Sequence, residues 1–307
     1  MMRSAVIFGG AGFIGSALSK LLAATKTFDR IVAVGRSSKP KHPLHQDIEY
    51  VQGDAADAAF VLGVLKGAEA VVDLSYSTVP KTSFDNPLLE ATLNLPACIN
   101  IMQQCVETGI QRYLLVSSGG TVYGNTSEPL VTEQHHTRPI SPYGIAKLMM
   151  EKYAFFYHQN FALPAVVARP SNPFGLHQVG DSPQGFLGNA ISCLMSDRPV
   201  TVYGQHGTVR DYIYIEDLAR GLMDCLLFGR PGEAYNIGTG AGMDNMQALE
   251  LLETVFTTRF SGVNRQAPRP FDVNSNVLDH SKLTSLNGWR PSHNVRSGLE
   301  TLKRQLG

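Results

Sequence analysis

Tyr143 and Lys147 stand four residues apart in the segment SPYGIAKLMMEKY. On a helix, this spacing puts the phenol and the ammonium on one face. A phenol has a pKa of about 10 and is a poor base at neutral pH, whereas a nearby ammonium stabilises the phenolate. We therefore expect Tyr143 to move a proton at neutral pH, with Lys147 and a cofactor charge lowering its pKa by roughly 2–3 units.

A glycine-rich turn lies near the amino terminus, in VIFGGAGFIGSAL. Gly9 permits a tight turn after a strand, Gly12 lets the backbone approach a pyrophosphate, and Gly15 lets a helix pack closely on the strand. The first N–H groups of that helix then face the anion. We expect Gly9, Gly12, Phe13, Ile14 and Gly15 to bind a dinucleotide; a purely structural turn is the alternative.

The second strand ends in VAVGRSS, where a carboxylate that binds the adenosine ribose is usual. Gly35 and Arg36 stand there instead, so nothing repels a 2′-phosphate and Arg36 can pair with one. The cofactor is therefore NAD or NADP, and a solvated surface arginine is the alternative reading of Arg36. Asp54, beside Ala55, is placed to accept a hydrogen bond from the adenine amino group, or else to cap a helix.

These residues follow short apolar runs that alternate with helical patterns. We expect strands at Ala5–Phe8, Ile31–Val34, Glu49–Val51, Ala70–Leu74, Tyr113–Val116, Ala165–Ala168, Val200–Tyr203 and Ala234–Ile237. Helices are expected at Ser16–Thr25, Pro87–Thr108, Tyr143–Phe161, Phe186–Ser196 and Glu216–Leu227. Continuous apolar strands between helices favour an α/β fold with a doubly wound, Rossmann-type parallel sheet.

The turn-rich stretch NPFGLHQVGDSPQG predicts a loop that leaves the sheet after Asn172. We expect residues 1–172 to form a dinucleotide-binding domain, with 213–240 returning to it. Residues 173–212 and 241–307 then form a smaller α+β domain for the substrate.

Composition narrows the function further. The 307 residues carry 26 basic and 26 acidic side chains without a block of one sign, which argues against a nucleic-acid partner. Four scattered cysteines, without C-x-x-C pairs or clustered histidines, predict core residues in a reducing compartment and no metal site. No apolar run approaches the roughly 20 residues of a membrane span, and the first strand leaves no room for a signal peptide. We expect a cytoplasmic protein.

Together the motifs resemble the extended short-chain dehydrogenases/reductases, and most of all their nucleotide-sugar epimerases of the UDP-glucose 4-epimerase type. The resemblance spans nearly the whole chain and rests on GGAGFIG, SSGGTVYG, SPYGIAK, ARPSNPFG, VYGQHGTVRDYIYIEDLARG, YNIGTG, APRPFD and LNGWRP.

The resemblance implies roles for matching residues. Tyr143 corresponds to the base for the substrate 4-hydroxyl, Lys147 to its tuning partner, and Asn94 to an asparagine behind the nicotinamide. Asn172, Arg210, Arg269 and Asp272 correspond to residues that bind the diphosphate and nucleoside of the substrate, although surface salt bridging is an alternative for the arginines. Further cofactor contacts are expected at Leu74, Ser75, Ser117 and Pro170. Helices around Leu88–Cys105 and Ala146–Phe156 would suit the homodimer of that family.

Three departures from the family pattern stand out. The Ser or Thr that bonds the reacting oxygen falls on Gly119, the ribose-binding acid falls on Gly35, and DLSYSTVP is richer in hydroxyls than usual. Ser118, Thr121, Ser75 or Ser77 can supply the missing hydroxyl, or it is absent; we expect Ser118 and Thr121 in the catalytic set, with Ser118 also on the substrate.

We expect NAD(P)-dependent C4 epimerisation of a UDP-hexose through a transient 4-keto sugar. Net reduction or oxidation of such a sugar is an alternative, and a dinucleotide-binding sensor without turnover is another. Dehydration is disfavoured, because Gly120 and Thr121 replace the Asp-Glu pair of the related dehydratases.

Overall fold

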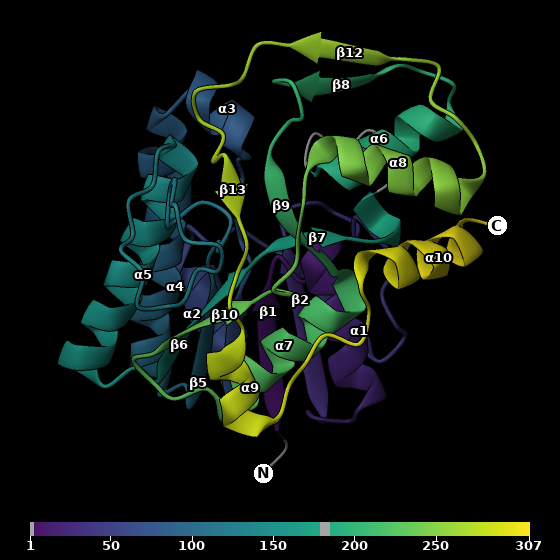
Figure 1. The fold of residues 1–307 in the computed structure, drawn as a ribbon. Helices are drawn as coiled ribbons and strands as arrows, with labels where there is room; N and C mark the ends of the chain where they lie inside the picture. The colour runs from purple at the N-terminus through teal and green to yellow at the C-terminus, as the bar shows by residue number, and fades with distance from the viewer. Residues whose placement is uncertain (1–2, 179–184) are drawn as a thin grey trace.

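A computed structural model describes residues 3–178 and 185–307 and folds them around a parallel sheet (Figure 1). Within these residues the large sheet has seven strands in the order β10–β6–β5–β4–β1–β2–β3. They are β1 (Ser4–Phe8), β2 (Arg30–Gly35), β3 (Ile48–Gln52), β4 (Ala70–Asp73), β5 (Arg112–Val116), β6 (Ala165–Pro170) and β10 (Ala234–Ile237). The strand order reverses between β1 and β4, where a doubly wound sheet opens a crevice for ligands. The Rossmann-type prediction is confirmed.

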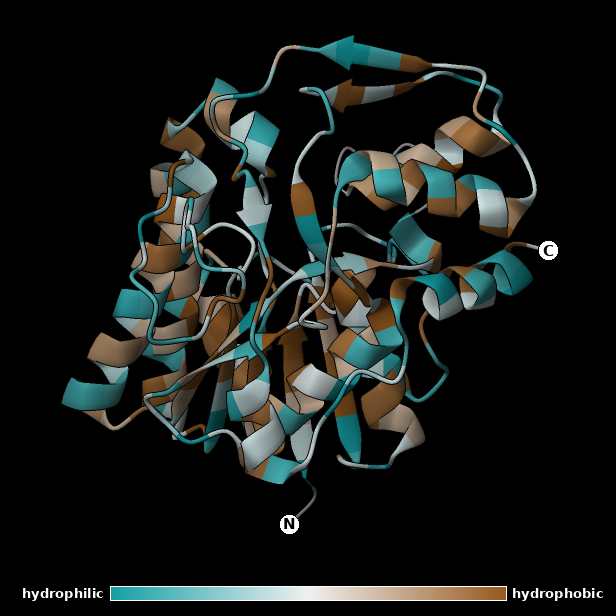
Figure 2. Cartoon of the chain, viewed as in Figure 1, coloured by the Kyte–Doolittle hydropathy of each residue, from teal (hydrophilic) through white to brown (hydrophobic). Residues whose placement is uncertain are grey.

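Helices cover both faces of the sheet because successive strand residues point to opposite sides. In β1, Ala5 and Ile7 join the core that includes α1 (Phe13–Ala24) and α7 (Ile215–Phe228). Val6 and Phe8 join the opposite core. That second core is completed by α2 (Ala58–Leu65), α4 (Leu95–Thr108) and α5 (Pro142–Phe161). Figure 2 shows the central strands as mostly hydrophobic, as a sheet buried on both faces requires.

A smaller lobe lies on the side of the sheet opposite the amino terminus (Figure 1). Its strands are β7 (Asn172–Phe174), β9 (Val209–Tyr214), β11 (Gly242–Met243) and β13 (Ser275–Asn276), with β8 (Val200–Tyr203) paired to β12 (Val263–Gln266). The remaining elements are α3 (Pro80–Asp85), the π-helical turn η1 (Glu90–Asn94), the 3₁₀ turn η2 (Leu176–Gln178), α6 (Phe186–Met195), α8 (Asn245–Phe256), α9 (Ser281–Asn287) and α10 (Val295–Leu306).

The predicted strands agree with the observed ones to within two residues, but three details differ. The helix expected over Pro87–Thr108 is split, because η1 precedes α4. The loop expected from Asn172 begins with β7, which pairs with β9, and continues into η2; its residues 179–184 lie outside the described part of the chain. β9 was not anticipated. The division into two domains at residues 172 and 240 stays a prediction, although β10 does pair with β6.

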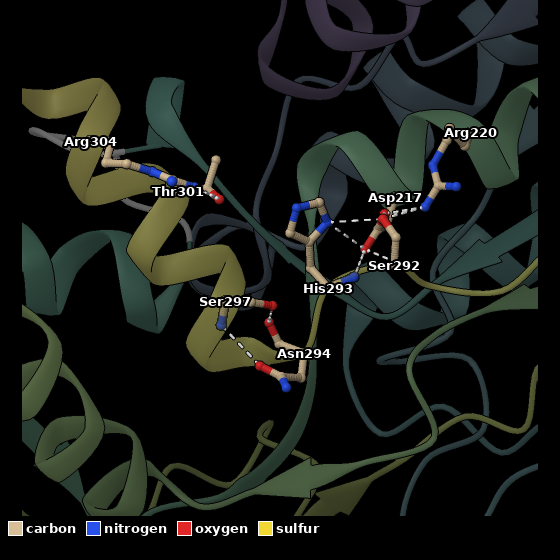
Figure 3. A network of polar contacts seen from close by, with 8 residues as sticks. All are labelled: Asp217, Arg220, Ser292, His293, Asn294, Ser297, Thr301 and Arg304. Atoms are coloured by element: carbon tan, nitrogen blue, oxygen red, sulfur yellow. Dashed lines mark hydrogen bonds and ion pairs between the residues drawn. The ribbon is translucent and has the colours of Figure 1, made fainter.

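A buried carboxylate fixes the start of α7 to the segment that leads into α10 (Figure 3). Asp217 accepts hydrogen bonds from the Ser292 hydroxyl at 2.7 Å and the His293 backbone N–H at 2.8 Å, and it pairs with Arg220. Burial opposes ionisation of Asp217, but these donors outweigh burial and lower its pKa. Asn294 then caps α10 by accepting from the Ser297 N–H at 2.9 Å. The network therefore ties the start of α7 to the segment that leads into α10.

The four cysteines are buried free thiols, in keeping with their predicted place in the core. In the ranges 3–178 and 185–307, the helices are too short or too polar to span a bilayer.

Candidate functional site

One cleft of about 1080 Å³ opens at the carboxyl ends of the central strands and continues to the smaller lobe. A single small ligand usually fills about 300–1,000 Å³, so this cleft has room for two ligands end to end. Every residue that the sequence indicated for catalysis, cofactor or substrate lines it: Gly9, Gly12, Phe13, Ile14, Gly15, Arg36, Asp54, Ala55, Leu74, Ser75, Asn94, Ser117, Ser118, Thr121, Tyr143, Lys147, Pro170, Asn172, Arg210, Arg269 and Asp272.

The glycine turn forms a cradle with no room for side chains. Gly9 has a φ of 75°, and a Cβ there would lie 2.7 Å from the carbonyl oxygen of Leu74. A Cβ on Gly15 would lie 2.2 Å from the carbonyl oxygen of Gly9. Gly12 caps α1 without a side-chain hydrogen bond, so the first N–H groups of the helix stay available to a ligand. This donor set fits the pyrophosphate of a dinucleotide.

The missing acid after β2 has a steric explanation. A Cβ on Gly35 would lie 2.7 Å from the hydroxyl of Tyr50, which donates to the carbonyl oxygen of Ser37 at 2.6 Å. The Tyr50 ring therefore takes the space of a larger residue and fixes the turn that presents Arg36. Arg36, Ser37 and Lys41 line this end of the cleft. Such groups favour a 2′-phosphate over free ribose hydroxyls.

Asp54 lies at the same end and is exposed. One of its oxygens accepts from the backbone N–H of Ala56 at 2.9 Å. The residue that caps a helix here is not Asp54 but Asp57, which caps α2 by accepting hydrogen bonds from the backbone N–H groups of Ala59 and Phe60. The second carboxylate oxygen of Asp54 can therefore serve an adenine amino group.

The Tyr143–Lys147 pair stands at the start of α5. Ser141 caps the helix by accepting from the Gly144 N–H at 3.1 Å, which puts Tyr143 in the first turn. The Lys147 ammonium is buried and donates to the carbonyl oxygen of Val116 at 3.0 Å. Burial lowers the pKa of Lys147, while the Asp73 carboxylate opposes that change.

In the protein alone the pKa of Tyr143 is raised, so the lowering expected from Lys147 together with a cofactor charge stays a prediction. Burial raises this pKa, the charge of Glu90 raises it further, and a hydrogen bond from Ser118 lowers it. The Lys147 Nζ lies 6.0 Å from the centroid of the Tyr143 ring, which limits its influence on the phenol. Without a bound cation, Tyr143 is therefore a phenol at neutral pH.

Ser118 is the leading candidate for the missing hydroxyl, because it lines the cleft and its hydroxyl lowers the pKa of Tyr143. Gly119 faces away from the cleft: a Cβ there would lie 2.4 Å from Cδ1 of Leu278. The Thr121 hydroxyl is buried without a partner among the described residues, and Thr121 lines the cleft. Ser75 instead donates to Asp73 at 2.6 Å. Ser118 and Thr121 both line the cleft, so which of them supplies the hydroxyl stays a prediction.

Two predicted cofactor contacts use their side chains elsewhere. The Ser117 hydroxyl donates to Glu151 at 2.5 Å, and Glu151 pairs with Arg169 at 2.6 Å in the core. Asn94 accepts from the backbone N–H of Ser77 at 2.8 Å and donates to Glu90 at 2.9 Å. Both residues line the cleft, so their roles toward a cofactor stay predictions.

The far end of the cleft is basic. Arg210 donates to the carbonyl oxygens of Val209 and Val273 and forms no ion pair with any residue the structure describes. Arg269 pairs with Asp272 at 2.7 Å and lies over the Tyr203 ring, and the role of this pair toward a substrate stays a prediction. Asn172 lines the same cleft, and its amide donates to the carbonyl oxygen of Asp211.

Sequence reasoning missed Tyr76, Thr78 and Glu90, which form a hydrogen-bonded group behind Tyr143. The hydroxyl-rich segment DLSYSTVP was a signal for the first two. Glu90 gave none, because a glutamate in a helical pattern normally lies in solvent.

The chain was compared with protein-family models and with known proteins. Residues 5–238 match the model of the NAD-dependent epimerase/dehydratase family. The chain is 27% identical over 312 residues to dTDP-4-dehydro-6-deoxyglucose reductase of Escherichia coli, covering 98% of this chain and 96% of that protein.

Solved structures are similar along the whole chain. UDP-glucose 4-epimerase of Thermotoga maritima with UDP-glucose superposes with a TM-score of 0.92 at 26% identity, covering 99% of this chain and 100% of that one. A dTDP-glucose 4,6-dehydratase of Streptomyces venezuelae with NAD bound gives 0.91 at 26% identity, covering 98% and 96%. Epimerases, reductases and dehydratases are thus about equally similar.

Proposed function

The chain belongs to the NAD-dependent epimerase/dehydratase family, and on that premise we propose that it inverts C4 of a UDP-hexose through a transient 4-keto sugar. One observation carries the proposal: a single cleft joins the glycine turn, the Ser118–Tyr143–Lys147 group and the guanidinium groups of Arg210 and Arg269. A dinucleotide at one end and a sugar diphosphate at the other would meet beside Tyr143.

When bound, a nicotinamide dinucleotide supplies reversible hydride transfer with C4 of the sugar. With its pKa lowered by the positive charge of a bound oxidised cofactor, Tyr143 as the phenolate would take the proton of the 4-hydroxyl, and as the phenol it would later return it, while Ser118 would donate to the reacting oxygen. Lys147 has donors left beyond its bond to Val116, and these can bind the nicotinamide ribose. Arg210 and Arg269 hold the diphosphate while the keto sugar turns its other face to the cofactor.

Proton NMR of reaction mixtures tests this proposal. Purified protein is incubated with UDP-glucose, UDP-galactose and their N-acetyl and uronate relatives, without added oxidant. Formation of the C4 epimer is the expected result, and the Tyr143→Phe variant should bind the cofactor without turnover. Full activity of that variant, or no turnover of any of these sugars, would overturn the proposal.

Net reduction with NADPH is a second candidate, favoured by the turn after β2. Tyr50 excludes an acid at residue 35, and Arg36 with Lys41 suits a 2′-phosphate. The measurement is binding of NAD and NADP to wild type and Arg36→Ala. If Arg36→Ala binds NADP more weakly than wild type but binds NAD equally well, the result supports NADP as the cofactor. Stoichiometric consumption of NADPH with a keto sugar would show reduction and not epimerisation.

Two other functions have less support. Dehydration requires an acid to expel a hydroxyl, and neither Gly120 nor Thr121 is one. A sensor without turnover would have no use for the buried Tyr143–Lys147 pair.

We also propose a homodimer that pairs the faces of η1, α4 and α5. Leu88 and Leu93 are exposed on one side, and Ile145, Met149 and Phe156 are exposed along α5. A patch of large apolar side chains on a soluble chain usually marks an interface. Sedimentation of wild type and Met149→Glu tests it, and a monomeric wild type would refute it.

A further inference from the structure

Glu90 is a buried carboxylate close to the reacting groups, in the π-helical turn η1. It accepts hydrogen bonds from the Tyr76 hydroxyl at 2.5 Å, the Thr78 hydroxyl at 2.5 Å and the Asn94 amide at 2.9 Å. Three donors are what an ionised carboxylate requires, since it can only accept. No Lys or Arg of the described residues pairs with it. A buried charge without an ion-pair partner is costly, so its position calls for a functional reason.

Tyr76 connects this carboxylate to the Tyr143–Lys147 pair. Its hydroxyl bonds Glu90, while the Lys147 Nζ lies 3.9 Å from the centroid of its ring. The Tyr76 ring also meets the Tyr143 ring edge-on, with centroids 5.0 Å apart. Lys147 therefore has two fixed contacts, the Val116 carbonyl and the Tyr76 ring, and the second depends on Glu90 for its orientation.

The surrounding charges come from every neighbouring element. The groups that act on Tyr143 or Lys147 are Asp73 of β4, Tyr76 after β4, Glu90 of η1, Cys98 of α4, Ser118 after β5 and Glu151 of α5, with Lys81 of α3 on the rim of the cleft. Arg169 neutralises Glu151. Asp73 accepts from Ser75 and Tyr113. Asp73 and Glu90 thus face one buried cation, Lys147, and a phenolate at Tyr143 would add a third negative charge.

We propose that Tyr76 and Glu90 are positioning residues of the hydride-transfer site, where Tyr76 holds the Lys147 ammonium and Glu90 keeps Tyr143 as the phenol that gives a proton to a carbonyl. This inference rests on the proposed function. In the step concerned, the Tyr143 O–H bond breaks and an O–H bond forms on the carbonyl oxygen. The carbonyl carbon gains hydride from a reduced nicotinamide dinucleotide, which is oxidised, and the phenolate then takes a proton from water. The arrangement favours reduction of the keto sugar over oxidation of the alcohol.

Tyrosine labelled with ¹³C at the ring carbon that bears oxygen makes the protonation of Tyr143 visible by NMR. The full chain is titrated with saturating NAD⁺ or NADP⁺, whichever binds, and Tyr143→Phe assigns the resonance. In Glu90→Gln the midpoint should fall by about one pH unit, because a like charge is removed. Thr78→Val is the matched control: it removes a donor to Glu90 and keeps the charge, so its midpoint should stay near that of wild type.

Rates in the two directions separate this role from mere support of the fold. With a phenolate more populated, Glu90→Gln should oxidise the nucleotide sugar about tenfold faster at pH 7, and the high-pH limit of reduction should move down by about one pH unit. A purely structural role would lower both rates and overturn the proposal.

If Glu90→Gln does not fold, the double variant Tyr76→Phe/Glu90→Leu replaces it, since it removes donor and acceptor together and keeps a ring against Lys147. An unchanged Tyr143 midpoint in the folded variant also overturns the role of Glu90. A shifted midpoint in a protein that turns over no nucleotide sugar would instead refute the proposed function alone.

Discussion

Adding a serine at Gly119 should destabilise the protein and should not speed its reaction. The family pattern puts a catalytic hydroxyl at this residue, so sequence alone favours a gain of activity from Gly119→Ser. In the structure, a Cβ there would lie 2.4 Å from Cδ1 of Leu278 and 2.8 Å from the carbonyl oxygen of Arg169. The new hydroxyl would therefore enter the core and not the cleft.

The size of the effect follows from what can move. Leu278 is fully buried against Val122, Tyr123 and Val131. The backbone of Gly119 is itself fixed, because its N–H donates to Pro170 and its carbonyl accepts from Asn276, both at 2.9 Å. Overpacking of this kind costs about 1–3 kcal/mol, and a fixed backbone puts it near the upper end. A loss of about 3 kcal/mol lowers the melting temperature of a 307-residue chain by roughly 4–5 °C.

Gly120→Ser is the matched control. A Cβ on Gly120 would have its nearest neighbours at 3.8 Å, on the Asn172 amide, and would face the cleft. Its unfolding free energy in urea should stay within about 0.5 kcal/mol of wild type. If Gly119→Ser were as stable as Gly120→Ser, the packing argument would be refuted. If it turned over substrate faster than wild type, the proposed role of Ser118 would be refuted.

Three further predictions concern the side chains of Ser118, Asp217 and His42. Ser118→Ala should lower kcat about 10²-fold in steady-state assays, because one donor to the reacting oxygen is lost; an unchanged kcat would move the role to Thr121. Asp217→Asn should cost about 2–4 kcal/mol in urea unfolding. Since the pKa of Asp217 is lowered from 3.8, wild type loses this contribution as the pH falls below that value, and the variant should lack that acid dependence. Burial, the stacked His177 and Lys41 lower the pKa of His42 from 6.5 to about 4, so the unfolded chain binds a proton that the folded chain does not. Stability should therefore fall as the pH falls from 6.5 towards 4, and melting curves of His42→Gln should show a smaller decrease.

The large sheet could be predicted because each of its strands is recognisable from its own short stretch of sequence. The strands of the large sheet are continuous apolar runs, and in β1 all five residues are buried. β9 shows the opposite case. Its polar residues Arg210 and Asp211 interrupt the apolar pattern, yet Asp211 is fully buried. Its partners are Thr239, Gly240 and Leu278, which are distant in sequence and meet it only in the fold. The aromatic and β-branched residues Tyr212–Tyr214 were a local signal for this strand, but the polar pair before them interrupts it.

The candidate site was predictable in its membership and not in its electrostatics. Glycine, tyrosine and lysine spacings located the cleft, because each needs a particular strand or helix end. The pKa of Tyr143 is raised by burial and by the charge of Glu90, which lies in η1 and accepts a hydrogen bond from Tyr76. The spacing of residues within a motif does not show which carboxylate from a distant part of the sequence is buried beside the phenol.

The three departures from the family pattern have one physical form: each residue is matched to a partner from another part of the chain. Gly35 gives room to the Tyr50 hydroxyl, and Gly119 gives room to the Leu278 side chain. Tyr76 brings a hydroxyl that Glu90 binds. Tyr50 and Leu278 occupy the space that a side chain at Gly35 or Gly119 would need. Glu90 instead accepts the hydrogen bond of the Tyr76 hydroxyl. A side chain introduced at Gly35 or Gly119 therefore meets an occupied space, and we expect cofactor choice and proton transfer to depend on such pairs of residues as well as on the motif positions.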